Sequence, residues 1–407
     1  MTKFIVGQLG VPRHSAAAKA LYERGLLDQF VTDTYFSTKG SLANLPLIGP
    51  KLTAKYKKYD PGFTNDVVSG DWLGALSFRF RLKYSDRITA FKAANKRLGD
   101  RLIAYAKDKQ PGKYFGFDTI SIDFLEWAHD KGWKAYLEQC VAPRSSQIEM
   151  WQLFQEKYGI DYSSHIDYCR FQQDIERKEW GYSSNIIVPS EYVKNELIKD
   201  GSVDINKVSV VNYGYTPNVS RETILNQIEQ KFAKKQDSFN ILFAGNSGYR
   251  KGIKDILTIA EAFKNEPVQF LLAGLLENDA QELVQKYPNK NLVYLGKLSN
   301  EELAKQYLNA DLFFFPSYLE GSALVLIEAM SWGLPIVTTY QSGSVIEDGL
   351  NGFLSNAGDV EGLKSSITKL LAQPELRFNM AVSSLEKSAL YSVKEYGIKL
   401  TDVLINK

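Results

Sequence analysis

The chain has 407 residues, of which 44% are hydrophobic and 24% are charged. This length and balance predict two or three globular domains and exclude a disordered, collagen-like or coiled-coil chain. The 49 basic and 47 acidic residues leave a formal net charge of +2, so charge gives no global reason to expect nucleic acid as a partner. Two cysteines, and three histidines without metal-ligand spacing, argue against a disulfide framework and a zinc site.

The chain contains no apolar run near the ~18 to 20 residues that a membrane-spanning helix requires. Its beginning, MTKFIVGQLGVPRHS, predicts a strand and a loop rather than a basic signal peptide. We therefore expect a cytoplasmic protein.

Short β-branched and aromatic runs alternate with segments of helical periodicity, which predicts an α/β fold with parallel sheets covered by helices. In the first half of the chain, strands are predicted near residues 4–9, 28–35, 117–122, 134–141, 185–189 and 208–213. In the second half, they are predicted near residues 239–244, 268–273, 291–295, 312–316 and 335–339. We expect two doubly wound, Rossmann-like domains that face a cleft at the carboxyl ends of their strands, where such folds bind ligands.

The two series of strands are separated by a polar, charged segment, residues 215–238, which is predicted to be a linker. It would join an N-terminal domain over residues 1–214 to a C-terminal domain over residues 239–390. Residues 391–407 are predicted to form a helix that crosses back to the N-terminal domain. Residues 36–116 do not follow the alternation and are predicted to be an insertion.

The insertion contains a basic segment with helical periodicity from Ile88 to Tyr105. Between residues 79 and 109, ten basic and three acidic residues give a net charge of +7. The simpler interpretation is a solvated helix whose apolar face meets the domain core. The alternative is docking on an anionic membrane surface, which would make the protein peripheral on the cytoplasmic face of the membrane.

The first candidate site lies in FFFPSYLEGSALVLIEAMSWGLPIVTT, residues 313–339. A predicted strand ends at Pro316, a loop carries Glu320 and Gly321, and an apolar helical run begins near Ser322. The free amides at a helix start can bind an anion. Glu320 and Glu328 could be ordinary charged residues of a loop and a helix, but Glu328 lies in an apolar run. An unpaired carboxylate is costly to bury there, which favours a ligand or a specific partner.

The second candidate site is FAGNSGYRKGIKDIL, residues 243–257, where a predicted strand runs into a glycine-rich turn. Glycines let the backbone approach phosphate oxygens, and Arg250 and Lys251 supply positive charge at the same point. The spacing differs from that of a Walker A loop. By itself, the turn is a weak indication of phosphate binding.

Together, the two segments resemble the nucleotide-sugar half of the family 4 glycosyltransferases, which are retaining enzymes of the GT-B fold. EGSALVLIE, residues 320–328, matches the family's E-x7-E motif, and YRKGI, residues 249–253, matches its lysine-glycine motif. Further similar stretches are EAMSWGLPIV and residues 344–354, 176–201, 207–214 and 10–14. Residues 36–116 match no family pattern.

The resemblance implies that Arg250, Lys251 and Glu320 are the catalytic groups. The two basic residues would bind the donor diphosphate, while Glu320 would bind hydroxyls of the transferred sugar and Glu328 the ribose. The other donor contacts implied are Gly10, Gly245, Leu298 near the base, Gly321, and the amides of Ser322, Ala323 and Leu324 at the distal phosphate.

The sequence departs from the family pattern at two places. Asn246 follows the glycine after which many members have an arginine, so Arg250 is expected to supply that charge. The histidine that is frequent in the N-terminal domain is missing near residues 139–142. His129 is expected on the surface and not in that role. Arg13 and His14 are candidates for the acceptor side, although His14 could equally be an ordinary residue at a helix start.

The implied reaction transfers a sugar, with retention, from a nucleotide-diphosphate sugar to a hydroxyl of a glycan or lipid-linked acceptor, in polysaccharide or glycolipid assembly. The chain has no DxD sequence, so we expect no metal and no other cofactor. One alternative is a nucleotide-sugar epimerase or hydrolase of the same fold, which would need its own acid and base in the first domain. Another is a non-catalytic GT-B-like partner subunit, which would be expected to lack the basic pair or the glutamates.

Overall fold

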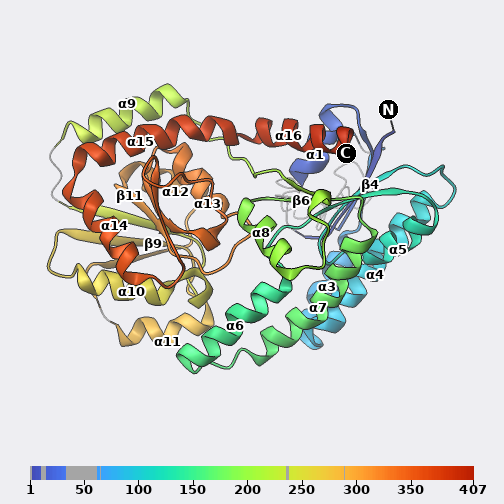
Figure 1. Cartoon of the computed structure of the whole chain (residues 1–407), viewed down its shortest axis with the longest axis horizontal. Helices are drawn as coiled ribbons and strands as arrows, with labels where there is room; N and C mark the ends of the chain where they lie inside the picture. Colours follow the sequence, from blue (N-terminus) through green and yellow to red (C-terminus); the bar gives the residue numbers. More distant parts are fainter. Residues whose placement is uncertain (1, 11–14, 34–61, 65, 235–237, 288) are drawn as a thin grey trace, which may run out of the picture. The chain divides into compact units, whose positions relative to one another are not determined.

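The computed structural model describes residues 2–10, 15–33, 62–64, 66–234, 238–287 and 289–407 (Figure 1). The chain forms two compact units. The first unit comprises Met1–Val188, Lys194–Val211 and Gly397–Lys407, and the second comprises Pro189–Val193 and Asn212–Tyr396.

The first unit is built on a parallel sheet that has, in the described residues, the strand order β3-β2-β1-β4-β5-β6-β7. The strands are β1 (Phe4–Gln8), β2 (Leu27–Thr32), β3 (Val68–Gly70), β4 (Lys113–Phe117), β5 (Lys134–Glu138), β6 (Asn185–Val188) and β7 (Val208–Val210). Every residue of β1 is buried, as expected for a strand covered on both faces. The strand order reverses between β1 and β4, the place where doubly wound folds bind ligands.

Helices connect the strands of the first unit. They are α1 (Ser15–Glu23), α3 (Trp72–Tyr84), α4 (Arg87–Ala106), α5 (Ile122–Asp130), α6 (Arg144–Tyr158), α7 (Ser163–Tyr182) and α8 (Glu191–Asp200). The final helix, α16 (Val393–Asn406), contributes residues from Gly397 onward to this unit. There Asp402 forms an ion pair with Arg24, which follows α1, at 2.7 Å.

The second unit is also built on a parallel sheet, with the strand order β10-β9-β8-β11-β12-β13. The strands are β8 (Phe239–Ala244), β9 (Val268–Ala273), β10 (Leu292–Gly296), β11 (Leu312–Phe315), β12 (Ile336–Thr339) and β13 (Gly352–Ser355). Its helices are α9 (Arg221–Phe232), α10 (Ile253–Ala262), α11 (Asn278–Lys286), α12 (Asn300–Asn309), α13 (Leu324–Ser331), α14 (Val360–Ala372) and α15 (Pro374–Ser388). Figure 1 shows α10 and α11 on one side of this sheet and α12 and α13 on the other.

The predicted fold class, two doubly wound α/β domains, is confirmed. The strand predicted at 117–122 was misplaced: β4 ends at Phe117, and the chain then turns into α5. The buried carboxylate of Glu179 accepts hydrogen bonds from the amides of Thr119 (2.6 Å) and Ser121 (2.7 Å), and Thr119 has a positive φ of 67°. These amides therefore bind a side chain instead of a neighbouring strand.

The predicted linker, residues 215–238, also differs from the structure. It contains α9, in which Ser220 caps the helix and Ile224 and Ile228 are buried in the core of the second unit. A polar, charged sequence with two buried positions one turn apart is an amphipathic helix, and its exposed polar residues give it the composition of a linker.

The described part of the predicted insertion belongs to the first sheet and to the helices that pack on it. β3 pairs with β2, and α4 buries Leu98 and Leu102 in the core. Residues 36–61 lie outside the described residues. Among the helices described, none combines the length and the apolar character needed to cross a membrane.

Candidate functional site

The glycine-rich turn after β8 is held by two glycine positions. Gly252, with φ of 76°, passes so close to β11 that an added Cβ would lie 2.2 Å from the carbonyl oxygen of Pro316. Gly274, after β9, allows a similar approach, because a Cβ there would lie 2.0 Å from the carbonyl oxygen of Gly245. Larger residues would separate these segments. The turn is therefore fixed against the carboxyl ends of β9 and β11.

This packing brings together the three residues predicted to be catalytic. Arg250 Nη1 lies 2.8 Å from Glu320 Oε1, and Lys251 Nζ forms an ion pair with the same oxygen. The hydroxyl of Ser317 donates to Glu320 Oε1 at 2.8 Å. The amide of Tyr318 donates to the carbonyl oxygen of Arg250 at 2.8 Å, so the backbones are joined as well. The two candidate segments, 70 residues apart in sequence, form one site.

The electrostatics of this cluster favour an anion. Lys251 and Glu320 are only 15% and 13% exposed, and Arg250 is 29% exposed. Burial alone would raise the pKa of Glu320, but Lys251 and then Arg250 hold it below its usual value. Burial lowers the pKa of Lys251, and Glu320 opposes that change. The cluster thus holds two cations in a poorly solvated place, where each interacts strongly with a phosphate.

Glu277 is a member of this neighbourhood that sequence reasoning missed. It precedes α11, and its amide donates to the carbonyl oxygen of Ser247 at 2.9 Å. Burial raises the pKa of its carboxyl, while Arg250 opposes the rise. The sequence did contain a signal for Glu277: it follows β9 as Glu320 follows β11. Because parallel strands end at the same edge of the sheet, the two glutamates are expected to lie near each other.

The helix start predicted near Ser322 is at Leu324, where α13 begins. The amide of Ala323 donates to the carbonyl oxygen of Ser342 at 3.0 Å. Of the three amides assigned to the distal phosphate, those of Ser322 and Leu324 are thus the better candidates. Gly321 packs closely against Gly343, where an added Cβ would lie 2.2 Å from the Gly321 carbonyl oxygen. The loop before α13 is therefore firmly held.

Glu328, predicted to need a ligand or a specific partner, is half-buried on α13. The hydroxyl of Tyr307 in α12 donates to Glu328 Oε2 at 3.2 Å. Tyr307 is 2% exposed, and its ring stacks on Trp332 with the ring planes 10° apart. The carboxylate is thus oriented by a fixed aromatic residue, 21 positions earlier in the chain, which no local pattern indicated.

The remaining predicted residues are more scattered. Gly10, after β1 in the first unit, has φ of 82°, and its amide donates to Asp33 Oδ1 at 2.8 Å. Leu298 follows β10 and packs on the core of the second unit. Arg13 and His14 lie outside the described residues. His129 is exposed on α5, as expected for a surface residue.

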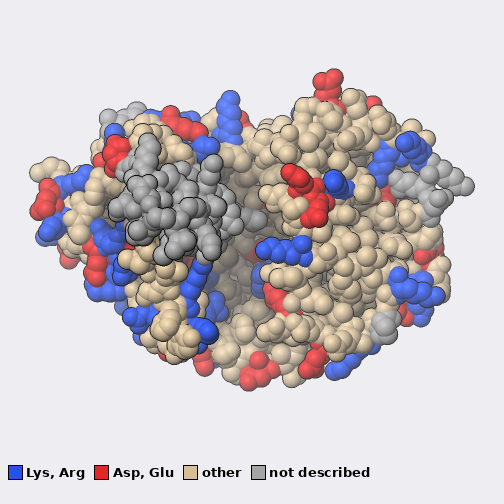
Figure 2. Space-filling model, turned by 180° about the vertical axis from the view of Figure 1, so that it is seen from behind, with Lys and Arg blue, Asp and Glu red and all other residues tan. Residues whose placement is uncertain are grey.

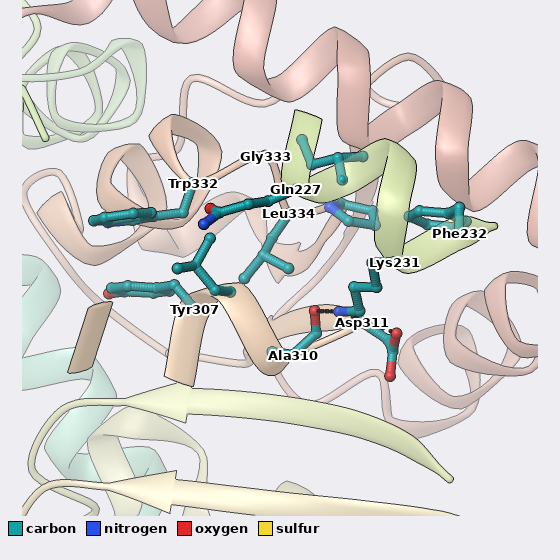
Figure 3. Close-up of a pocket in the computed structure, with 12 residues that line it drawn as sticks. Gln227, Lys231, Phe232, Tyr307, Ala310, Asp311, Trp332, Gly333 and Leu334 are labelled. Atoms are coloured by element: carbon teal, nitrogen blue, oxygen red, sulfur yellow. Dashed lines mark hydrogen bonds and ion pairs between the residues drawn. The ribbon is translucent and has the colours of Figure 1, made fainter. Parts of the chain in front are cut away.

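A separate cavity in the second unit, shown in Figure 3, is too small for a substrate. Its volume is about 20 Å³, enough for one water molecule. Lys231 of α9 reaches across it to Asp311 at 3.1 Å and to the carbonyl oxygen of Ala310. Burial lowers the pKa of Lys231, and Asp311 opposes that change. This ion pair ties α9 to the start of β11 and is structural.

Comparison with known proteins supports the assignment of the second unit. Residues 226–384 match the family model described as glycosyl transferases group 1. The sulfoquinovosyl transferase SQD2 of Arabidopsis thaliana is 26% identical over 53% of this chain and 43% of its own length. The capsular polysaccharide biosynthesis glycosyltransferase CapM of Staphylococcus aureus is 28% identical over 48% of this chain and 54% of its own. The chain thus spans about half the length of these curated relatives.

Solved structures share the fold over the whole chain. Anabaena HepE in complex with UDP-glucose has a TM-score of 0.61 at 14% identity and covers 100% of both chains. WaaG, a glycosyltransferase involved in lipopolysaccharide biosynthesis, has a TM-score of 0.65 at 14% identity and covers 99% of this chain and 100% of its own. At this identity, the likeness establishes the fold.

Proposed function

We propose that this chain, whose residues 226–384 match the family model of glycosyl transferases group 1, transfers a sugar from a nucleotide-diphosphate sugar to an acceptor hydroxyl. The observation that carries the proposal is the cluster in which Arg250 and Lys251 share the carboxylate of Glu320. It lies at the carboxyl ends of the strands and directly before the start of α13. Both are places where α/β folds bind phosphates.

In the structure, Glu320 is the anion that the two cations bind. A diphosphate carries more negative charge than one carboxylate, so it would take over Arg250 and Lys251 as partners. Glu320 would then be available to accept hydrogen bonds from hydroxyls of the transferred sugar. As the bond to the sugar breaks, negative charge grows on the leaving diphosphate, and cations already in place stabilise it. This scheme needs no metal.

Glu328 is proposed to accept hydrogen bonds from the donor's ribose, with Tyr307 holding its carboxylate in position. Because HepE was solved with UDP-glucose, UDP-sugars are the first donors to test. We propose retention of the anomeric configuration, on the strength of the E-x7-E match at residues 320–328.

The acceptor is proposed to be a glycan or a lipid-linked glycan bound by the first unit. The names of the relatives and neighbours, which refer to capsular polysaccharide and lipopolysaccharide biosynthesis, support polysaccharide or glycolipid assembly. We also propose that the basic segment 79–109 meets an anionic membrane surface on the cytoplasmic side.

The test is incubation with UDP-, GDP- and ADP-sugars and candidate acceptors, scored by release of the nucleoside diphosphate and by the proton NMR coupling constant of the product's anomeric hydrogen. We expect acceptor-dependent release and the donor's configuration in the product. Release without an acceptor would favour a hydrolase, and an inverted product would exclude the retaining family. A non-catalytic subunit would release nothing, although the basic pair and both glutamates are present.

A further inference from the structure

Helix α3 carries an apolar stripe on the side that faces away from the protein. Leu73, Leu76, Phe80 and Tyr84 are 55%, 42%, 64% and 64% exposed. They are spaced by three, four and four residues, so they lie on one side of the helix. The rings of Phe80 and Tyr84 are in contact, with centroids 4.5 Å apart. A contiguous exposed patch of this kind marks an interaction surface.

The opposite side of α3 is anchored to α4, so the helix is a fixed part of the first unit. Ala75 is buried there. Asp71 caps the helix by accepting from the amide of Gly74 at 3.0 Å, and its carboxylate also binds Arg97 of α4, with Nη2 at 2.9 Å. Arg101 of α4 lies 3.8 Å from the same carboxylate. The start of α3 is therefore fixed to α4, while the apolar stripe stays exposed.

Ion pairs in the structure show which basic residues of the segment 79–109 are neutralised by acidic partners. Arg97 and Arg101 are paired with Asp71, and Lys109 is paired with Asp28 at 2.9 Å; neither acidic residue was in the segment counted from the sequence. Lys96 is paired with Asp100. Much of the charge on and after α4 is thus neutralised. By contrast, α3 contains three basic residues beside the apolar stripe, Arg79, Arg81 and Lys83, and no acidic residue.

Basic residues beside exposed apolar and aromatic side chains are the composition of a helix that lies in a membrane interface. Charge alone does not single out this place, because Figure 2 shows basic and acidic side chains interspersed over the visible face. A second copy of this chain fits poorly, since pairing the two stripes would bring together Arg79, Arg81 and Lys83 of both helices.

We propose that α3 inserts into the interface of an anionic bilayer, with the apolar stripe at the level of the acyl chains and the three basic residues among the headgroup phosphates. Arg81 also borders a groove of about 420 Å³ between α3 and α4, which gives one headgroup room beside the helix. This inference rests on the proposed membrane surface, residues 79–109, and assigns the membrane contact to α3. It places a lipid-linked acceptor in the same membrane as the enzyme.

The experiment is flotation of the full chain with vesicles of phosphatidylcholine, with and without about 30% phosphatidylglycerol. We expect binding to the anionic vesicles that weakens with salt. R79Q/R81Q/K83Q should lower the partition coefficient roughly 100-fold, because each basic residue near an anionic surface contributes about fivefold. L73Q/F80Q keeps the charge and should lower it at least tenfold, because two apolar side chains no longer enter the membrane.

The matched control is K131Q/K178Q/K305Q, which removes the same charge from three exposed lysines on other elements and should bind like the wild type. Wild type that fails to float with anionic vesicles would overturn both this inference and the proposed membrane surface. Binding that survives both α3 variants would overturn the insertion of α3 alone. A dimer in gel filtration that L73Q/F80Q dissociates, without vesicle binding, would assign the stripe to self-association. Thermal stabilisation by UDP reports on the donor site separately and should be equal in all variants.

Discussion

Lys251→Ala tests the proposed donor site most directly. The side chain is 15% exposed, forms an ion pair with Glu320, and lies 4.9 Å from the ring centroid of Phe315. If it stabilises the leaving diphosphate, its removal should lower kcat by ~10² to 10³, the loss typical of one preorganised electrostatic donor (~2.7 to 4 kcal/mol). The effect should fall on kcat, because the negative charge that it opposes grows in the transition state.

The structure also bounds the effect of this change on stability. Leaving a buried charge with no partner costs ~3 to 5 kcal/mol, but Glu320 would keep Arg250 and Ser317, each at 2.8 Å. We therefore expect a smaller loss, on the order of 1 to 2 kcal/mol, and a folded variant. Circular dichroism and a thermal melt check this, so that a lower kcat is not mistaken for unfolding.

Lys254→Ala is the matched control, because it removes a lysine one helical turn away that binds Tyr287 instead of Glu320. The assay measures nucleoside diphosphate release at saturating acceptor over a range of donor concentrations. Lys254→Ala should stay within about threefold of wild type, since changes at exposed sites rarely cost more than ~0.5 kcal/mol. A folded Lys251→Ala enzyme with kcat equal to that control would refute the role of Lys251.

Other expectations test the ribose site, metal independence and the buried acids of the first unit. Glu328→Ala should raise the donor KM at least as clearly as it lowers kcat, because ribose contacts persist from ground state to transition state; Tyr307→Phe, which removes one hydrogen bond, should raise KM by about two- to tenfold with little change in kcat. A donor KM unchanged in both would contradict the ribose assignment. UDP, GDP or ADP should raise the melting temperature in excess EDTA, and a shift that appears only with a divalent cation would contradict metal independence. Burial raises the pKa of Glu176 from an ordinary 4.5 to about 7, so the folded state binds the proton more tightly than the unfolded state. Stability from this group is then present below pH 4.5 and lost as pH rises to about 7, by about 3 kcal/mol at 1.36 kcal/mol per pH unit. Chemical denaturation across this range should show wild type losing stability relative to E176Q, whereas a pH-independent difference would count against the buried charge.

The sequence alone determined the fold class and most of the second unit. The strands predicted at 239–244 and 268–273 have the observed limits, because the strands of a parallel sheet are continuous apolar runs bounded by turn residues. The basic pair Arg250 and Lys251 and the glutamate pair were also visible, because each motif is local. Their meeting could be expected from the rule that the carboxyl ends of parallel strands share an edge.

Only the tertiary structure decided which charges are neutralised and which carboxylates are oriented. Asp71 binds Arg97 across 26 residues, and Tyr307 binds Glu328 across 21. Such pairs depend on how helices pack, and a charge count over a sequence window does not include a partner outside the window. For the same reason, the sequence spreads the net positive charge over residues 79–109, whereas in the structure most basic residues of α4 are paired and those of α3 lie beside its exposed stripe. Local periodicity determines which residues share a helix face, but packing determines whether that face is covered.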